Sequence, residues 1–290
     1  MAHKNKFLMK TAALASRALP TPVKRWLYKV PFLARFIRGS LNATAPEGIT
    51  EVTIAAGVLE GMRMALDLHI EKDYWLGTYE PDLQVAALQF IKPGMVVYDV
   101  GANIGYISLM AARLAEEQGK VFSFEALPAN IARLNQNVSL NAFQERVRVI
   151  HAAVVDKAGE VSFLAHASGA MGKALGSAGR DEQYTQTIKE EGIALDDFVF
   201  KQENPAPSVI KMDIEGGEGI ALAGMPRLLK EIRPVLLIEL HGEEAARQVW
   251  GCLKANGYTL RPMRKGAPAI RSLSELDWKA YVVARPDSQI

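Results

Sequence analysis

The sequence predicts an α/β fold with a doubly wound, mostly parallel, seven-stranded Rossmann-like sheet, preceded by an N-terminal helical arm. Three observations lead to this prediction. From Met95 onward, short apolar runs alternate with helical patterns, as a parallel sheet with crossover helices requires. A glycine-containing turn directly follows the first of these runs. The chain has 290 residues, of which 49% are hydrophobic, and this suits a globular core.

The first part of the chain, residues 1–46, differs in charge from the rest. It holds nine Lys or Arg and no Asp or Glu, which leaves 25 basic against 32 acidic residues in the remainder. Apolar and cationic residues mix over 4–42. Such an amphipathic arm either makes peripheral contact with an anionic membrane or packs on its own chain or a second subunit, and both interpretations are open. Because the remainder is acidic, we expect no nucleic-acid partner.

Composition also bears on location. Lys or Arg interrupts every apolar run in the first forty positions before it reaches the ~18 residues that a membrane-spanning helix requires. Cys252 is the only cysteine, so no intrachain disulfide can form, which fits a reducing compartment. We therefore expect a cytoplasmic protein, on the inner membrane face if the arm binds lipid.

Residues 47–94 predict a lead-in segment of two short strands and one helix. The helix begins at Pro81 and is stopped by Pro93 and Gly94, which cannot continue it. The expected strands cover 52–54 and 62–66. The domain organisation predicted is thus an arm at 1–46, a lead-in at 47–94 and a main domain at 95–290.

The main domain alternates strands and helices. A Gly/Ala/Ser-rich insertion at 165–179, preceded by a short extra strand at 160–164, suits an active-site lid or a plain surface loop. The expected helices cover 106–114, 128–140, 221–229 and 243–255, and the expected sheet strands cover 96–100, 121–124, 147–153, 209–214, 235–240, 258–260 and 280–283.

A glycine turn and two acidic residues define the candidate cofactor site. The turn at 101–105 joins the first strand to its helix, where open α/β sheets meet their ligands. Gly101 and Gly105 remove side chains where backbone approaches a ligand, and the helix N-terminus behind them suits a carboxylate. Asp99 is placed to accept hydrogen bonds from an ammonium group, directly or through water, and to repel pyrophosphate. Glu125 ends the second strand, near the spacing at which an acid meets ribose hydroxyls, so the set describes a nucleoside carrying an amino acid.

Two alternatives belong to other functional classes. An NAD-dependent oxidoreductase would carry a Gly-x-Gly-x-x-Gly turn, but Asn103 occupies the middle glycine position and no third glycine follows. A catalytically inactive binding or membrane-tethered scaffold would keep the fold and lose turnover. Calorimetry with the cofactor discriminates between the scaffold and an enzyme.

From about Tyr74 to the C-terminus, the chain resembles the FkbM family of methyltransferases, named after a macrolide O-methyltransferase. The resemblance implies an enzyme that uses S-adenosylmethionine to methylate a hydroxyl of a small-molecule acceptor, a sugar, glycolipid or secondary metabolite. Four segments carry it, namely the glycine turn at 98–106, Phe-Glu-Ala-Leu-Pro at 124–128, the signature at 195–198 with 210–218, and Leu-Ile-Glu-Leu-His at 237–241.

The resemblance also implies the residues around the cofactor. This chain departs from the family pattern at two of these places. Gly217 stands where the family often has Ala or another small residue. No acid ends the third strand, so the adenine amino group is bound by backbone, by Asp156 or by no specific partner. Tyr79 and Glu80 precede the domain and either close over the cofactor or cap the next helix. The full expected set is Asp99, Gly101, Ala102, Asn103, Gly105, Tyr106, Glu125, Ala126, Ala153, Asp213, Tyr79 and Glu80.

Catalytic candidates follow the fourth and fifth strands. Methyl transfer from a sulfonium is an in-line displacement, so the protein has to align the acceptor and take or hold its proton. Lys211, Asp213 and Glu215 alternate toward one face. His241 is the general base favoured by residue type, because an imidazole titrates near neutral pH. Glu218 lies in the next helical turn, where a carboxylate stabilises the helix dipole.

The same acids raise the question of a metal. Asp213, Glu215 and Glu239 are hard ligands that suit Mg²⁺ or Mn²⁺. Their spacing is not diagnostic, so we expect no metal. Neither the acceptor nor the oligomeric state is specified by the sequence.

Overall fold

The computed structural model describes residues 45–166, 172–177, 184–277 and 280–287. The predicted helical arm, with its membrane contact at 4–42, lies outside them. Contacts divide the chain into two compact units, Met1–Pro81 and Asp82–Ile290. Among the described residues, no helix combines the length and apolarity needed to cross a bilayer.

The described part of the first unit is a hairpin followed by one helical turn. Strands β1 (Ile49–Thr53) and β2 (Arg63–Asp67) pair antiparallel, and α4 covers Lys72–Trp75. Two strands occur where the sequence indicated two: β1 begins three residues before the predicted strand, and β2 is displaced by one residue. The apolar side chains of Ile54 and Leu59 in this unit are buried.

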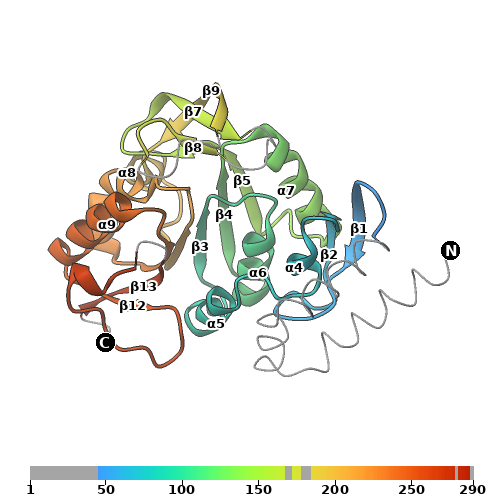
Figure 1. Ribbon diagram of the computed structural model, residues 1–290, viewed down its shortest axis with the longest axis horizontal. Helices are drawn as coiled ribbons and strands as arrows, with labels where there is room; N and C mark the ends of the chain where they lie inside the picture. Colours follow the sequence, from blue (N-terminus) through green and yellow to red (C-terminus); the bar gives the residue numbers. More distant parts are fainter. Residues whose placement is uncertain (1–44, 167–171, 178–183, 278–279, 288–290) are drawn as a thin grey trace. The chain divides into compact units, whose positions relative to one another are not determined.

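The second unit is built on the predicted seven-stranded sheet, with strand order β12-β13-β11-β10-β3-β4-β5 (Figure 1). Strand β13 runs opposite to the other six strands, so the mostly parallel Rossmann-like architecture is confirmed. The strands are β3 (Val96–Val100), β4 (Lys120–Glu125), β5 (Val147–His151), β10 (Val209–Met212), β11 (Val235–Glu239), β12 (Tyr258–Pro262) and β13 (Tyr281–Pro286).

The strand order reverses between β3 and β10. From β3 the chain winds outward through β4 and β5, and it then returns to place β10 on the other side of β3. In open α/β sheets such a reversal leaves a crevice beyond the carboxyl ends of the two strands, because their connections leave in opposite directions. The sequence segments that follow β3 and β10 begin at Gly101 and Asp213, so these residues border the crevice.

Helices flank the strands much as predicted, with one exception. The expected helix over 221–229 is wrong in extent, because the chain forms a short α-helix and then a separate π-helix. Gly224 lies between them, where an added Cβ would overlap the Val155 carbonyl oxygen. The helices of this unit are α5 (Pro81–Phe90), α6 (Tyr106–Ala115), α7 (Pro128–Leu140), α8 (Glu218–Ala223), α9 (Glu243–Ala255), the π-helices η1 (Asp197–Lys201) and η2 (Leu228–Ile232), and the 3₁₀-helix η3 (Leu273–Glu275).

A second, four-stranded sheet forms where the sequence indicated one short strand and an insertion. Its order is β6-β9-β7-β8, and it lies at the top of Figure 1. Part of the segment expected to be a lid or loop is therefore strand β8, although residues 167–171 and 178–179 lie outside the described residues. The strands are β6 (Ala153–Val154), β7 (Gly159–His166), β8 (Gly172–Ala174) and β9 (Tyr184–Ile193).

An aromatic cluster fixes the strands that carry the glycine turn. The rings of Tyr98, Phe122 and Phe124 each lie within 6 Å of the Phe198 ring, with centroid separations of 5.7, 5.7 and 5.1 Å. The Tyr98 hydroxyl donates a hydrogen bond to the Pro205 carbonyl at 2.7 Å. Since side chains alternate along a strand, burying Tyr98 on this face turns Asp99 to the opposite face.

Candidate functional site

A pocket opens at the carboxyl ends of β3, β4 and β10. Its walls come from the segments that follow these strands, from Ala152 and Ala153 after β5, and from the four-stranded sheet. Of the predicted site residues, it is lined by Gly101, Asn103, Glu125, Ala126, Ala153, Asp213 and Glu215. The small sheet and the loop after β8 contribute Phe163, Gly172, Ala174 and Ser177, none of which the sequence singled out.

Glu125 is held at the pocket wall by three hydrogen-bond donors. Its Oε2 accepts the backbone N–H of Asn103 at 2.8 Å, while Oε1 accepts the Leu127 N–H at 2.9 Å and the Asn130 amide at 3.2 Å. Burial raises the pKa of Glu125, although these donors lower it in part. Asn103 has a φ of 49°, a left-handed conformation that Asn tolerates, and this turns its N–H toward the carboxylate.

The structure gives the two glycines of the turn a physical reason that the sequence did not suggest. Gly101 has a φ of +75°, and a Cβ there would overlap the Asp213 carbonyl oxygen. Gly105 has a φ of +93°, and a Cβ there would overlap the Leu134 side chain. Both positions therefore serve close packing within the protein. Gly101 also lines the pocket, whereas Gly105 does not.

Asp99 and Lys211 form a buried ion pair behind the turn. Asp99 is fully buried, its Oδ2 accepts the Ser108 hydroxyl at 2.6 Å, and its Oδ1 lies 3.2 Å from Lys211 Nζ. Lys211 also donates to the Gly101 carbonyl at 2.7 Å. Since the Asp99 carboxylate has no exposed surface, the direct contact with a cofactor ammonium that the sequence suggested has no support in this geometry.

Several other predicted residues lie away from the pocket wall. Ala102 and Tyr106 are buried and do not line the pocket, and the Tyr106 hydroxyl lies 3.5 Å from the Gln84 amide. Tyr79 and Glu80 belong to the first unit, where the Tyr79 ring lies 4.2 Å from the ring of Tyr74. Their contact with a cofactor stays a prediction.

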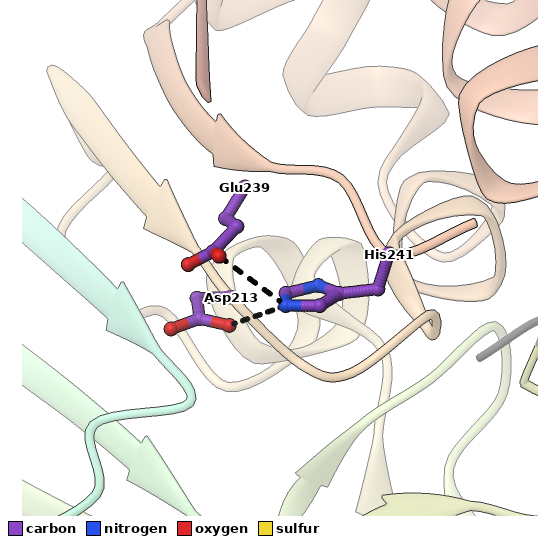
Figure 2. Close-up of side chains that lie close together, drawn as sticks. All are labelled: Asp213, Glu239 and His241. Atoms are coloured by element: carbon purple, nitrogen blue, oxygen red, sulfur yellow. Dashed lines mark ion pairs between the residues drawn. The ribbon is translucent and has the colours of Figure 1, made fainter. Parts of the chain in front are cut away.

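An imidazole surrounded by carboxylates lies at the ends of β10 and β11. Figure 2 shows the His241 ring directed toward Asp213, which follows β10, and Glu239, which ends β11. His241 Nε2 lies 3.5 Å from Glu239 Oε1, 3.7 Å from Asp213 Oδ1 and 3.9 Å from Glu215 Oε2. The cluster reaches the pocket through Asp213 and Glu215.

Glu218 supports this cluster from behind. It begins α8, where we expected it to act on the helix dipole, but it is also completely buried. Its Oε1 is 3.2 Å from His241 Nδ1 and accepts the backbone N–H groups of Gly216 at 3.1 Å and Ile214 at 3.3 Å. Glu218 thus fixes both the loop after β10 and the orientation of the imidazole.

The carboxylates determine the charge of the imidazole. Burial alone would lower the pKa of His241, but the nearby carboxylates of Glu218, Glu239 and Asp213 raise it to about 11. Burial likewise opposes ionisation of Glu239, yet the contacts with the His241 imidazole and the Tyr281 hydroxyl hold its pKa below the usual range. An imidazole that is already protonated accepts no further proton, so this geometry does not favour His241 as the general base.

Two supporting residues of this site had a signal in the sequence. Asn130 lies in the first turn of the helix that begins at Pro128, and a polar residue so close to Glu125 was a candidate for orienting its carboxylate. Glu218 falls inside the signature segment at 210–218. No local pattern marks Ser177 or Tyr281, because each reaches the site only through pairing between distant parts of the chain.

Comparison with known proteins identifies relatives over the same region. The model of the family described as Methyltransferase FkbM domain matches residues 99–260. Hexuronic acid methyltransferase AglP of Haloferax volcanii is 30% identical over 162 residues, which cover 56% of this chain and 62% of that protein. The match thus spans less than two thirds of this relative. The 31-O-demethyl-FK506 methyltransferase FkbM of Streptomyces tacrolimicus is 28% identical over 204 residues, covering 59% of this chain and 75% of that protein.

Among solved structures, a methyltransferase FkbM from Methylobacillus flagellatus superposes with a TM-score of 0.45 and 15% sequence identity. That superposition covers 89% of this chain and 60% of the other.

Proposed function

Because this chain belongs to the FkbM methyltransferase family, whose model matches residues 99–260, we propose that it transfers the methyl group of S-adenosylmethionine to a hydroxyl of a small molecule. One observation carries the proposal. Glu125, fixed by three donors, shares a pocket wall with Gly101 and with Asp213. The pocket therefore places the fixed Glu125 carboxylate, which can accept hydrogen bonds from ribose hydroxyls, beside a carboxylate-lined opening where the hydroxyl group to be methylated can bind.

In the proposed complex, the Glu125 carboxylate accepts the ribose hydroxyls. The apolar walls from Ala153, Phe163 and Ala174 suit the adenine ring, which an aromatic or apolar surface can cover without hydrogen bonds. Asp99 and Lys211 are positioning residues, because they hold the Gly101 carbonyl and the turn without reaching the ligand.

The proposed reaction is a single in-line displacement. The acceptor oxygen forms a bond to the methyl carbon while the bond from that carbon to sulfur breaks, and sulfur keeps the electron pair as a thioether. The hydroxyl proton passes to Glu215, the most exposed carboxylate of the cluster, whose non-glycine backbone has a φ of 56°. A strained backbone at a pocket wall is a feature of functional sites. Asp213 orients the acceptor beside it.

The relatives suggest the class of acceptor. Their names describe a hexuronic acid and a demethylated FK506 as the molecules methylated. We propose that the acceptor here is a sugar, glycolipid or secondary metabolite with a free hydroxyl, and that methylation takes place on oxygen. Incubation with labelled methyl donor and cell extract, followed by identification of the labelled product, tests the acceptor class.

Calorimetry with S-adenosylmethionine tests the cofactor. We expect Glu125→Gln to weaken binding about 10- to 100-fold, because hydrogen bonds to a charged acceptor contribute about 1.5–3 kcal/mol. Glu145→Gln alters an exposed carboxylate elsewhere and is the matched control. Equal affinities of the wild type and the Glu125 variant, or no binding by the wild type, would contradict the proposal.

A peripheral membrane contact through residues 4–42, at the cytoplasmic face, is a separate proposal. It is supported by the nine cations without any acid in residues 1–46. Co-sedimentation with anionic liposomes tests it, and equal pelleting of the full-length and arm-deleted proteins would overturn it.

A further inference from the structure

We propose that Asp213, Glu239 and His241 bind one divalent metal ion beside the pocket. The three side chains converge from the ends of adjacent strands (Figure 2), and one ligand atom from each lies within 4.8 Å of the others. Sequence spacing did not indicate this set, since it had suggested Glu215 in place of His241.

The separations suit ligands of a shared ion better than hydrogen bonds. His241 Nε2 is 3.5 Å from Glu239 Oε1 and 3.7 Å from Asp213 Oδ1, beyond the usual hydrogen-bond length of about 3 Å. Two ligands about 2.1 Å from one ion are about 3.0 Å apart in octahedral and about 3.4 Å apart in tetrahedral geometry. The two distances from His241 need to contract by less than an ångström to match an ion in either geometry.

Each proposed ligand has an orienting partner of its own. Glu218 Oε1 holds His241 Nδ1, which leaves Nε2 directed at the two carboxylates. The Tyr281 hydroxyl bonds Glu239, and Lys211 Nζ lies 4.0 Å from Asp213 Oδ2. A histidine whose outer nitrogen contacts a carboxylate is the usual arrangement of a metal-bound imidazole, because that contact fixes the tautomer and raises ligand basicity.

The charge of the cluster also calls for a cation. Glu218 is completely buried, and its Oε2 has no hydrogen-bond partner among the residues that the structure describes. Around His241 lie four carboxylates, those of Asp213, Glu215, Glu218 and Glu239. The ammonium of Lys211 is closer to Asp99 than to this cluster, at 3.2 Å from Asp99 Oδ1 against 4.0 Å from Asp213 Oδ2. A divalent ion would compensate this excess negative charge more fully than a single proton does.

The ligand set indicates the kind of ion. Two carboxylates and one imidazole suit a first-row divalent ion that accepts both oxygen and nitrogen ligands, and Mn²⁺ is the probe of choice. Such a set leaves coordination positions open on the side of the pocket, to which Asp213 belongs. If the proposed function holds, an acceptor hydroxyl is the group that would occupy one of them.

Mn²⁺ binding to the full-length protein tests this site directly. Loss of the free Mn²⁺ signal in electron paramagnetic resonance measures affinity, and ¹⁴N couplings in the bound spectrum report an imidazole ligand. We expect one bound ion per chain, at least a tenfold loss of affinity in Asp213→Asn and Glu239→Gln, and about 10- to 100-fold in Glu218→Gln. The control Glu244→Gln removes an exposed carboxylate on α9 and leaves the affinity unchanged.

The ¹⁴N coupling is measured on the wild type, so the test remains decisive if a variant fails to fold. Loss of the coupling in His241→Asn assigns the signal to this imidazole. Absence of binding at about 1 mM Mn²⁺, or bound Mn²⁺ without the coupling, would overturn the site. S-adenosylmethionine binding, measured in the same preparation without metal, separates the two proposals. Cofactor binding without Mn²⁺ binding rejects the metal site alone, and the reverse result rejects the proposed function alone.

Discussion

Lys211 Nζ lies 3.2 Å from Asp99 Oδ1 and donates to the carbonyl of Gly101 at 2.7 Å. The two side chains arise from facing positions, because Asp99 and Lys211 pair in the register of β3 and β10. Their ion pair therefore joins the two strands between which the sheet reverses its order, directly behind the glycine turn. The geometry of the turn depends on this contact.

Lys211→Met should destabilise the protein by about 3–5 kcal/mol, because it leaves the Asp99 carboxylate buried without its cation. Urea denaturation followed by circular dichroism measures the change. The double variant Asp99→Asn with Lys211→Met removes both charges and should regain most of the loss. A single variant as stable as the wild type would show that the pair does not hold the turn.

Gly101→Ala should cost about 2–5 kcal/mol and weaken cofactor binding, because a left-handed Ala is strained and its Cβ overlaps the Asp213 carbonyl oxygen. Gly94→Ala is the matched control: its φ of +79° is similar, but nothing lies within 4 Å of an added Cβ. We expect the control to lose only about 1–2 kcal/mol. Thermal unfolding and calorimetry compare the two, and equal losses would refute the role of the close approach.

Asp196→Ala should lower stability without changing cofactor affinity. The Asp196 carboxylate accepts the backbone N–H groups of Arg227 at 2.7 Å and Leu228 at 2.9 Å, where η2 begins, so we expect a loss of about 1–2 kcal/mol. Asp197→Ala, which removes an ion pair to the exposed Lys201, should cost less than about 0.5 kcal/mol. A weaker cofactor affinity in the Asp196 variant would instead assign this residue to the site.

The single thiol offers a test of burial. Burial raises the pKa of Cys252, so little reactive thiolate forms at neutral pH. We expect Cys252 to react with a disulfide reagent at least about tenfold more slowly in the native protein than in urea, and faster as pH rises toward the thiol pKa. The absorbance of the released thiolate measures both rates. Equal rates in buffer and in urea would contradict this account.

Local patterns predicted the large sheet and one side of the pocket. The apolar run at 96–100, the turn that follows it and Glu125 lie on consecutive elements, so their meeting at one sheet edge follows from chain order alone. The same reasoning brought Asp213 and His241 to the ends of β10 and β11. The family resemblance added the cofactor, which the residues had described only as a nucleoside carrying an amino acid.

The remaining features depend on contacts between distant segments. Strand β9 has the polar run Lys-Glu-Glu at 189–191, which is typical of a solvated edge, and it acquires its place by pairing with β7 and β6. The burial of Asp99 follows from its pairing with Lys211 more than a hundred residues later, which strand-end position does not reveal. The charge of His241 depends on three acids, Asp213, Glu218 and Glu239, that only the folded chain assembles.

The antiparallel direction of β13 determines which insertions and deletions near the end of the chain would disturb Glu239. Because β13 runs opposite to β11, its first residue, Tyr281, faces Glu239, the last residue of β11. Insertions at the exposed residues 264–266 of the connection from β12 should leave this pairing, and with it the Tyr281 hydroxyl on its carboxylate, in place. Deleting the final strand would remove the support of Glu239 together with the strand that joins β12 to β11.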